Sequence, residues 1–147
     1  MHMGKLISAI LVLVIGIIAL VYVFDPYQKY KESSLKSFNN TLTKSIEKHD
    51  CTAIYQLKNG EYKARVTFDK FIFECSASKK PKSDKINVHK IWVVNDTGFV
   101  DRTRISCLTQ ACTEKDRVVD RSIKRYFFKS GNWTLSDEDN PLKIESN

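Results

Sequence analysis

The sequence predicts an α+β fold: an N-terminal transmembrane helix, then a long amphipathic helix and two short helices packed on a curved antiparallel sheet of about four strands. Three observations lead to this expectation. Residues 6–24 carry no charged side chain, apolar residues after Pro26 recur at helical spacing, and the chain beyond residue 86 alternates as strands do. The expected parts are a transmembrane signal-anchor at 1–25, a soluble α+β domain at 26–136 and an acidic flexible tail at 137–147.

The apolar run at 6–24 has the length of a membrane-spanning helix. At the helical rise of about 1.5 Å per residue it would extend roughly 28 Å, close to the thickness of the hydrocarbon core. A cleaved signal peptide would have a shorter apolar region and small residues at its cleavage site, whereas this run ends in Tyr22-Val23-Phe24. We therefore expect an uncleaved, single-pass anchor in a plasma or inner membrane.

Two features predict opposite orientations of this anchor. Lysines at 29, 31 and 36 follow the run and only Lys5 precedes it, so the positive-inside tendency would place the domain in the cytoplasm. The four cysteines, an even number in a small domain, are typical of an oxidising compartment. Because the N-terminal flank is too short for a reliable lysine count, we give the cysteines more weight and expect an extracytoplasmic domain.

An amphipathic helix is expected over 26–48. Asp25 can cap its start and Pro26 suits its first turn, so we expect the membrane helix to end there and a separate helix to begin. Apolar residues spaced three or four apart form one narrow stripe, and a stripe of this width favours packing on a sheet. Its members are Leu35, Phe38, Leu42 and Ile46.

The region 50–78 allows two interpretations. Asn59-Gly60 between apolar runs can indicate a hairpin, with strand-like alternation over 62–68. The alternation then breaks, and two short helices account better for the pattern. Asp50 would cap the first, and Thr67 would cap the second, with Asn59-Gly60 as the break after the first. Their apolar faces would be Cys51, Ile54 and Tyr55, and Phe68, Phe71, Ile72 and Cys75.

Strand patterns follow a basic loop at 79–85. Turn residues at 95–98 and at 130–132 separate segments of alternating side chains. We expect strands at 86–94, 99–108, 117–129 and 133–135.

This order of elements resembles the cone-shaped α+β fold of the nuclear-transport-factor-two-like superfamily. The resemblance covers 26–136, and its last segment reads Gly131-Asn132-Trp133, similar to the Gly-x-Trp of the family's terminal strand. It implies either a ketosteroid-isomerase-like enzyme or a non-catalytic binding domain. Some membrane-anchored members are inner-membrane subunits of type IV secretion machines, which use the domain for self-association and partner docking. The segments that carry the resemblance are 49–57, 67–72, 91–100 and 129–135.

The N-terminus also resembles that of type IV pilins, where an apolar helix leads into an amphipathic one. Gly4 matches the glycine before the pilin cleavage point, but Ala9 stands where pilins carry a glutamate. A pilin-like filament subunit is therefore one of the functional alternatives.

The cysteines are the most informative side chains. Cys107 and Cys112 would lie across a tight loop, and Cys51 and Cys75 would join the two short helices, so we expect two disulfides. The alternative is a set of buried free thiols in a cytoplasmic domain. No metal site is expected, because the cysteine spacing lacks a Cys-x-x-Cys pair and the histidines are isolated. We expect no cofactor.

Possible pocket residues are His89, Trp92 and Tyr126. His89 lies in a strand and could line the cone, where isomerase-like catalysis would need an acid–base group with a positioned partner. Asp101 or Asp120 could supply that partner, but no motif of catalysis is present. We expect no enzyme activity, and the aromatic residues, Trp92 and Tyr126 included, fit a core better than a base-stacking platform.

The arginines are the possible anion or partner contacts. Arg102 and Arg104 share one face of a strand, and Arg117, Arg121 and Arg125 share one face of another. On a concave face they could bind carboxylates or phosphates in forked pairs, and on a convex face they would be solvated or pair across strands. The solvated interpretation is preferred.

Composition narrows the kind of partner. The net charge of +7 favours anionic neighbours, and no module for nucleic-acid binding is present. We expect a membrane-anchored, non-catalytic domain that binds a protein partner, self-associates or contacts an anionic surface in envelope assembly. The alternatives are a small-molecule-binding or isomerase-like cone, which needs an internal cavity, and a pilin-like subunit, which needs one continuous helix and no independent cone.

Overall fold

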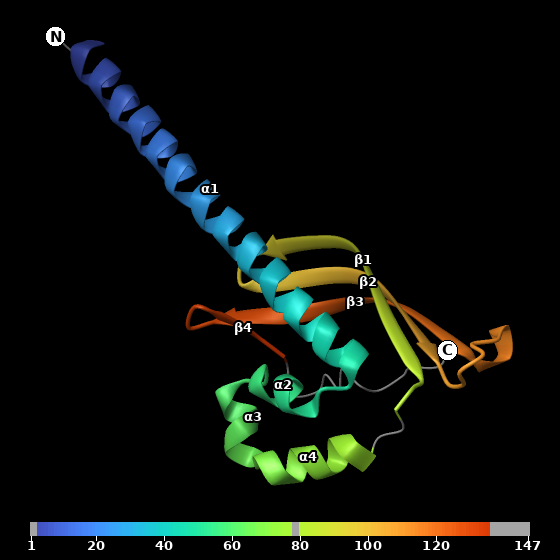
Figure 1. The fold of residues 1–147 in the computed structure, drawn as a ribbon. Coiled ribbons are helices and arrows are strands. Elements are labelled where there is room, and N and C mark those ends of the chain that lie inside the picture. Colours follow the sequence, from blue (N-terminus) through green and yellow to red (C-terminus); the bar gives the residue numbers. More distant parts are fainter. Residues whose placement is uncertain (1–2, 78–79, 136–147) are drawn as a thin grey trace.

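The computed structural model describes residues 3–77 and 80–135, and within the first helix it describes the side chains of 10–20 and 26–48. As expected, the fold is α+β, with helices packed on a curved antiparallel sheet of four strands (Figure 1). The expected tail at 137–147 lies outside the described residues. The elements are α1 (Met3–Lys48), α2 (Cys51–Gln56), α3 (Gly60–Arg65), α4 (Phe68–Ala77), β1 (Ser83–Val94), β2 (Thr97–Cys107), a 3₁₀ turn (Glu114–Asp116), β3 (Arg117–Lys129) and β4 (Asn132–Thr134).

The sheet is a meander in the order β1-β2-β3-β4, and tight turns produce its hairpins. Asn95 and Asp96 connect β1 to β2, and Asn95 has a φ of 56°. Ser130 and Gly131 connect β3 to β4, both with positive φ. Positive φ at two-residue turns matches the right-handed twist of the flanking strands. The strands predicted from the sequence are therefore confirmed to within a few residues.

The first helix differs from the prediction because it does not end before Pro26. Instead α1 runs without interruption across Pro26. A proline inside a helix costs about 3 kcal/mol, mainly through one lost backbone hydrogen bond. Long helical segments on both sides outweigh this local cost. The expected boundary at Asp25 is therefore wrong.

Among the described residues, no helix is both long enough and apolar enough to qualify as a membrane span. The predicted anchor, residues 6–24, lies partly outside the described side chains, which cover only 10–20 of it.

Both predicted helix caps are present after α1. The Oδ1 of Asp50 accepts a hydrogen bond of 2.9 Å from the amide of Ala53 and so caps α2. The Oγ1 of Thr67 accepts a longer bond of 3.4 Å from the amide of Lys70 in α4. These side chains satisfy amides that have no partner within the helix.

A third short helix was not predicted. Asn59-Gly60 begins α3 instead of forming a hairpin or a simple break, because the Oδ1 of Asn59 accepts a 2.7 Å bond from the amide of Tyr62. Asparagine is favoured both in turns and at helix N-termini, so the dipeptide alone does not separate the two.

The core lies between α1 and one face of the sheet. We call this the inner face, and it carries the even-numbered residues of β2 from Gly98 to Ser106. The outer face carries the odd-numbered residues of β2 and β3. A Cβ on Gly98 would lie 2.5 Å from the Cδ2 of Leu35, so α1 sits directly on the inner face there. The predicted stripe packs as expected, with Leu35, Leu42 and Ile46 fully buried.

Candidate functional site

The outer face of β3 alternates cationic and apolar side chains, and all of them are exposed. The apolar members are large and about half exposed: Val119 at 49%, Ile123 at 59% and Phe127 at 47%. Because successive residues on one face of a strand are about 6.6 Å apart, the cations and apolar groups form one continuous row. We call this row the outer ladder; it consists of Arg117, Val119, Arg121, Ile123, Arg125 and Phe127.

Few acidic groups neutralise the outer ladder. Arg121 is 3.4 Å from a carboxylate oxygen of Asp101, but its side chain is 70% exposed, so the pair is weak. Among the described residues, Arg117 and Arg125 have no ion-pair partner. These three arginines are therefore solvated, which is the interpretation preferred from the sequence. Only Arg121 also pairs with a carboxylate across the strands.

Beyond the ladder, Lys129 at the end of β3 makes a local pair. Its Nζ is 2.7 Å from a carboxylate oxygen of Glu61 in α3. This hydrogen bond lowers the pKa of Glu61 and raises the pKa of Lys129. The pair joins α3 to the sheet and leaves the ladder arginines unaffected.

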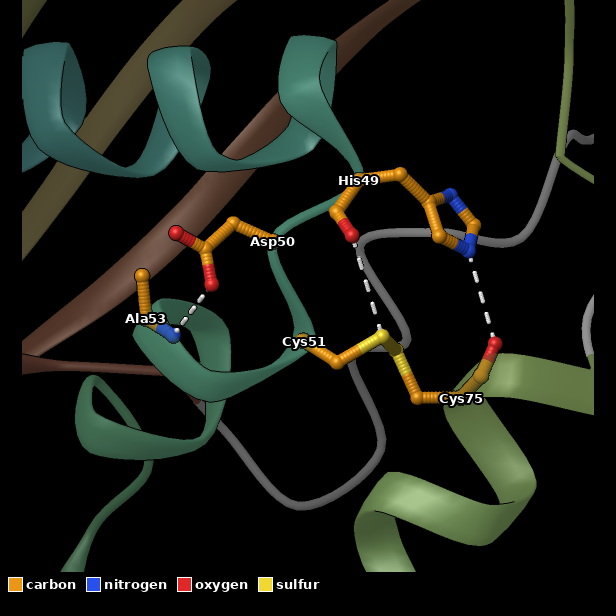
Figure 2. The surroundings of a disulfide bond; sticks show 5 residues. All are labelled: His49, Asp50, Cys51, Ala53 and Cys75. Carbon is orange, nitrogen blue, oxygen red and sulfur yellow. Dashed lines mark hydrogen bonds between the residues drawn. A yellow bond between two sulfur atoms is a disulfide. The ribbon is translucent and has the colours of Figure 1, made fainter.

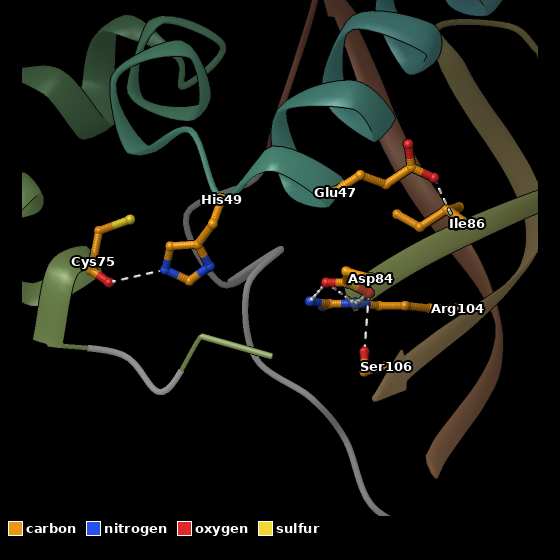
Figure 3. Close-up of polar contacts among 7 residues, drawn as sticks. All are labelled: Glu47, His49, Cys75, Asp84, Ile86, Arg104 and Ser106. Carbon is orange, nitrogen blue, oxygen red and sulfur yellow. Dashed lines mark hydrogen bonds and ion pairs between the residues drawn. The ribbon is translucent and has the colours of Figure 1, made fainter. Parts of the chain in front are cut away.

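Arg104 lies on the inner face, so the solvated interpretation is wrong for it. Its guanidinium contacts the carboxylate of Asp84, with its Nε donating to both oxygens at 2.9 and 3.1 Å, and its Nη2 also contacts that carboxylate. The hydroxyl of Ser106 donates to the same carboxylate at 2.9 Å (Figure 3). Both charged side chains are almost fully buried.

Arg102 is also buried on the inner face, with 2% of its surface exposed, so it is not solvated either. Unlike Arg104, its Nε and Nη1 have no hydrogen-bond partner in the part of the chain that the structure describes. Across the strands it faces Val88 on one side and Ser122 on the other, and neither is a carboxylate. The two arginines that share a face in the sequence thus have different surroundings.

The three predicted pocket residues do not come together. His89 is exposed at a bulge in β1, and its Nε2 lies 2.8 Å from the Oγ1 of Thr103 on the outer face. It borders an open groove between α1 and β1 instead of the interior between α1 and the sheet. Trp92 pairs across the strands with Phe99 of the outer face and stacks on its ring at 5.3 Å. Only Tyr126 is inside, fully buried and in edge contact with Phe38.

The cysteines pair as the sequence predicts. Cys51 bonds to Cys75 and joins α2 to α4, with Cα atoms 6.0 Å apart (Figure 2). Cys107 bonds to Cys112 across the loop after β2, with Cα atoms 5.1 Å apart. Among the described residues no cysteine is free, so the alternative of buried thiols is wrong for this structure.

His49 lies beside the first disulfide. Its Nε2 is 3.4 Å from the carbonyl oxygen of Cys75, and its backbone has a φ of 55°. This conformation ends α1, because the amides of His49 and Asp50 donate to the carbonyls of Ile46 and Ser45. Although the ring and the two sulfurs lie within 4.8 Å of one another, disulfide sulfurs are not thiolates and cannot act as metal ligands.

The loop closed by the second disulfide contains one notable carboxylate. The Oδ2 of Asp116 accepts hydrogen bonds from the hydroxyls of Thr113 at 2.6 Å and Thr109 at 2.9 Å. These bonds lower the pKa of Asp116. They tie the loop to the start of β3, at one end of the outer ladder.

Comparison with known proteins adds no assignment. No protein-family model matches the chain, and no curated protein is significantly similar to it.

Proposed function

We propose that this chain is a single-pass membrane protein whose extracytoplasmic domain binds an acidic protein partner through the outer ladder. The observation that carries the proposal is the row of half-exposed Val119, Ile123 and Phe127 with arginines between them. Exposed apolar side chains in contiguous sets are typical of interaction surfaces. Arginine is enriched at such surfaces because its guanidinium stacks on apolar groups and binds carboxylates in forked pairs.

The membrane location is supported by the uncharged run at 6–24, which has the length of a bilayer span. The extracytoplasmic side is supported by the two disulfides, because cytoplasmic thiols are normally kept reduced. The non-catalytic assignment is supported by the position of His89, which is exposed on the outer face and contacts the hydroxyl of Thr103 instead of lining the interior.

The ladder favours an acidic protein over a second copy of this chain. Two copies that met through the same face would bring Arg117, Arg121 and Arg125 close to their own equivalents, and like charges in such contacts cost several kcal/mol. A partner with carboxylates placed between apolar side chains would complement both kinds of group.

The ladder also favours a protein over a lipid surface. Phe127 lies at the end of β3 that is near Lys31 of α1, since its neighbour Phe128 is 5.5 Å from the Lys31 Nζ. From there β3 runs obliquely away from the N-terminal half of α1 (Figure 1). The ten steps from residue 127 back to residue 117 extend about 33 Å, so a bilayer that contains the start of α1 would reach only one end of the ladder.

The free edge of β3 offers a second kind of contact. Only Phe127, Phe128 and Lys129 pair with β4, so among the described residues the rest of β3 has a sheet neighbour on one side only. An extended segment of the partner could add there through backbone hydrogen bonds. Such a strand would lie directly beside the arginines.

Site-specific photo-crosslinking in intact cells tests this function. A photoreactive residue at Ile123 is expected to capture an acidic protein, whereas the same residue at Phe73, which is 77% exposed on α4, is the control. The double variant Arg121→Glu, Arg125→Glu should abolish the capture. Replacing carboxylates of the captured protein by lysine should restore it in the double variant.

Three results would contradict the proposal. They are equal capture from positions 123 and 73, a product that is a lipid or a second copy of this chain, and capture that charge reversal does not change.

The membrane assignment needs separate tests. The chain should stay with the membrane after alkaline carbonate extraction, and it should be released when Ile10, Leu13 and Ile17 are replaced by lysine. Alkylation in intact cells should leave all four cysteines unmodified until a reductant is added. Release of the unaltered chain by carbonate would disprove the anchor, and free cysteines without reductant would place the domain in the cytoplasm.

A further inference from the structure

We infer that the interior between α1 and the sheet binds a small, apolar monocarboxylate, with Arg102 as the residue that holds its carboxylate. This site is independent of the outer ladder, because Arg102 and the ladder lie on opposite faces of the sheet. Two buried polar side chains of the interior carry atoms that have no hydrogen-bond partner among the described residues.

Arg102 is the first of these side chains. It is 2% exposed, and both its Nε and its Nη1 lack a hydrogen bond. A buried charge without a partner is strongly unfavourable, and buried cations are normally paired. The side chain must face α1, because Gly98 and Val100 of the same face pack in the core and β2 pairs with β3 in unbroken register.

Asn39 is the second. It is fully buried, and neither its side-chain oxygen nor its nitrogen makes a hydrogen bond. On α1 it occupies the same stripe as Leu35, Leu42 and Ile46, so it faces the sheet. An asparagine in the middle of such a stripe interrupts an otherwise apolar contact surface.

Two contacts place Asn39 over Arg102's part of the sheet. On the N-terminal side of Asn39 in α1, Leu35 packs against Gly98 of β2. On the C-terminal side of Asn39, the carboxylate of Glu47 accepts a 2.9 Å hydrogen bond from the amide of Ile86 in β1, and Ile86 pairs with Arg104 of β2 (Figure 3). Between these points α1 passes over the part of β2 that carries Val100 and Arg102.

Arg104 shows which partner a guanidinium takes in this fold. Its position on the same face is equally buried, and the chain supplies the carboxylate of Asp84 and the hydroxyl of Ser106. At Arg102 the cross-strand neighbours are Val88 and Ser122, and the nearest carboxylate in register on that face, Asp120, stands opposite Arg104 and accepts a bond from Ser122 instead. Among the described residues Arg102 has no ion pair. A ligand carboxylate would complete the second pair, and the amide of Asn39 can donate a hydrogen bond to it.

Charge and surroundings define the class of ligand. One arginine balances one negative charge, so a monocarboxylate suits this interior better than a phosphate dianion. Towards α1 the interior is apolar, with Leu42 on the helix and Val100 beside Arg102 on β2 both fully buried. The remainder of the ligand should therefore be small and apolar.

The test is a titration of the full chain in neutral detergent with butyrate, using butyramide as the uncharged control. The Nε–H resonance of Arg102, assigned by its loss in Arg102→Met, should shift and saturate with butyrate and not with butyramide. The Nε–H resonance of Arg104 is the internal reference and should change little. Arg102→Met should weaken butyrate binding by roughly thirtyfold or more, and Arg121→Met on the outer face should leave it unchanged.

A second variant keeps the test decisive if Arg102→Met does not fold. Asn39→Asp would place a carboxylate of the chain beside Arg102, and it should abolish the butyrate shift in a folded protein. The inference is overturned if Arg102 does not respond to butyrate, if butyramide has the same effect, or if Asn39→Asp binds butyrate normally.

Discussion

The two buried arginines of β2 allow a stability prediction that compares equivalent positions. Replacing Arg104 by methionine leaves the Asp84 carboxylate, of which 3% is exposed, with the hydroxyl of Ser106 as its one side-chain hydrogen-bond donor among the described residues. Breaking a buried ion pair in this way typically costs about 3–5 kcal/mol. The loss of two charge-assisted bonds from the Nε and Nη2, at about 1.5–3 kcal/mol each, gives a similar value.

Replacing Arg102 by methionine removes no hydrogen bond made by its Nε or Nη1. We therefore expect a change within about 1 kcal/mol in the absence of carboxylate ligands, or a gain in stability. The two substitutions remove the same charge from the same face of the same strand. The difference between them, about 3 kcal/mol or more, measures what the partners of Arg104, Asp84 foremost, contribute to stability.

Both values can be measured by urea unfolding of the full chain in the absence of reductant, so that the disulfides stay intact. The fluorescence of Trp133 reports the transition. Trp133 is buried in the core, so its emission reports on the packing of the sheet. Urea is preferred because it does not screen ion pairs. The double variant Asp84→Leu, Arg104→Met should recover most of the loss. Equal destabilisation by Arg102→Met and Arg104→Met would refute the distinction between the two sites.

Three further predictions concern other parts of the fold. Gly98→Ala should destabilise the domain by about 1–3 kcal/mol in the same assay, because its Cβ would overlap Leu35; a neutral effect would contradict the close packing of α1. Removing the Cys51–Cys75 disulfide by double alanine substitution should cost about 3 kcal/mol through the entropy of the unfolded chain, whereas an unchanged urea midpoint would refute this. The lowered pKa of Asp116 means that its contribution is present above its unfolded value of 3.8 and is lost as pH falls through the folded value; amides in the loop before β3 should therefore lose protection against hydrogen exchange, relative to their intrinsic rates, below about pH 4, and Asp116→Asn should remove this pH dependence.

The sheet and two of the short helices could be predicted because their signals are local. Asn95 and Gly131 lie in turns, and Asp50 and Thr67 lie at helix starts, where side-chain chemistry determines the backbone. The cysteine pairs followed from the same elements, since placing α2 and α4 also places Cys51 and Cys75.

The buried site could not be predicted, because alternation shows which residues share a face and not which face is covered. In β2 the even positions carry Arg102 and Arg104, and the odd positions carry Phe99 and Ile105. Hydrophobicity alone would turn the odd face inward. The tertiary packing of α1 and the local Asp84–Arg104 pair decide the opposite arrangement, and neither is visible in the strand itself.

The continuity of α1 has a mechanical consequence. A helix of 46 residues is about 69 Å long, and its C-terminal part is fixed to the sheet by Leu35, Leu42 and Ile46. If residues 6–24 lie in a bilayer, a continuous, stiff helix connects the domain to the membrane in place of a flexible linker. The direction in which the domain faces would then follow from the tilt and rotation of the helix in the lipid. A force on the domain would be transmitted along α1 to the membrane, and a change in the tilt of the helix in the membrane would be transmitted to the domain.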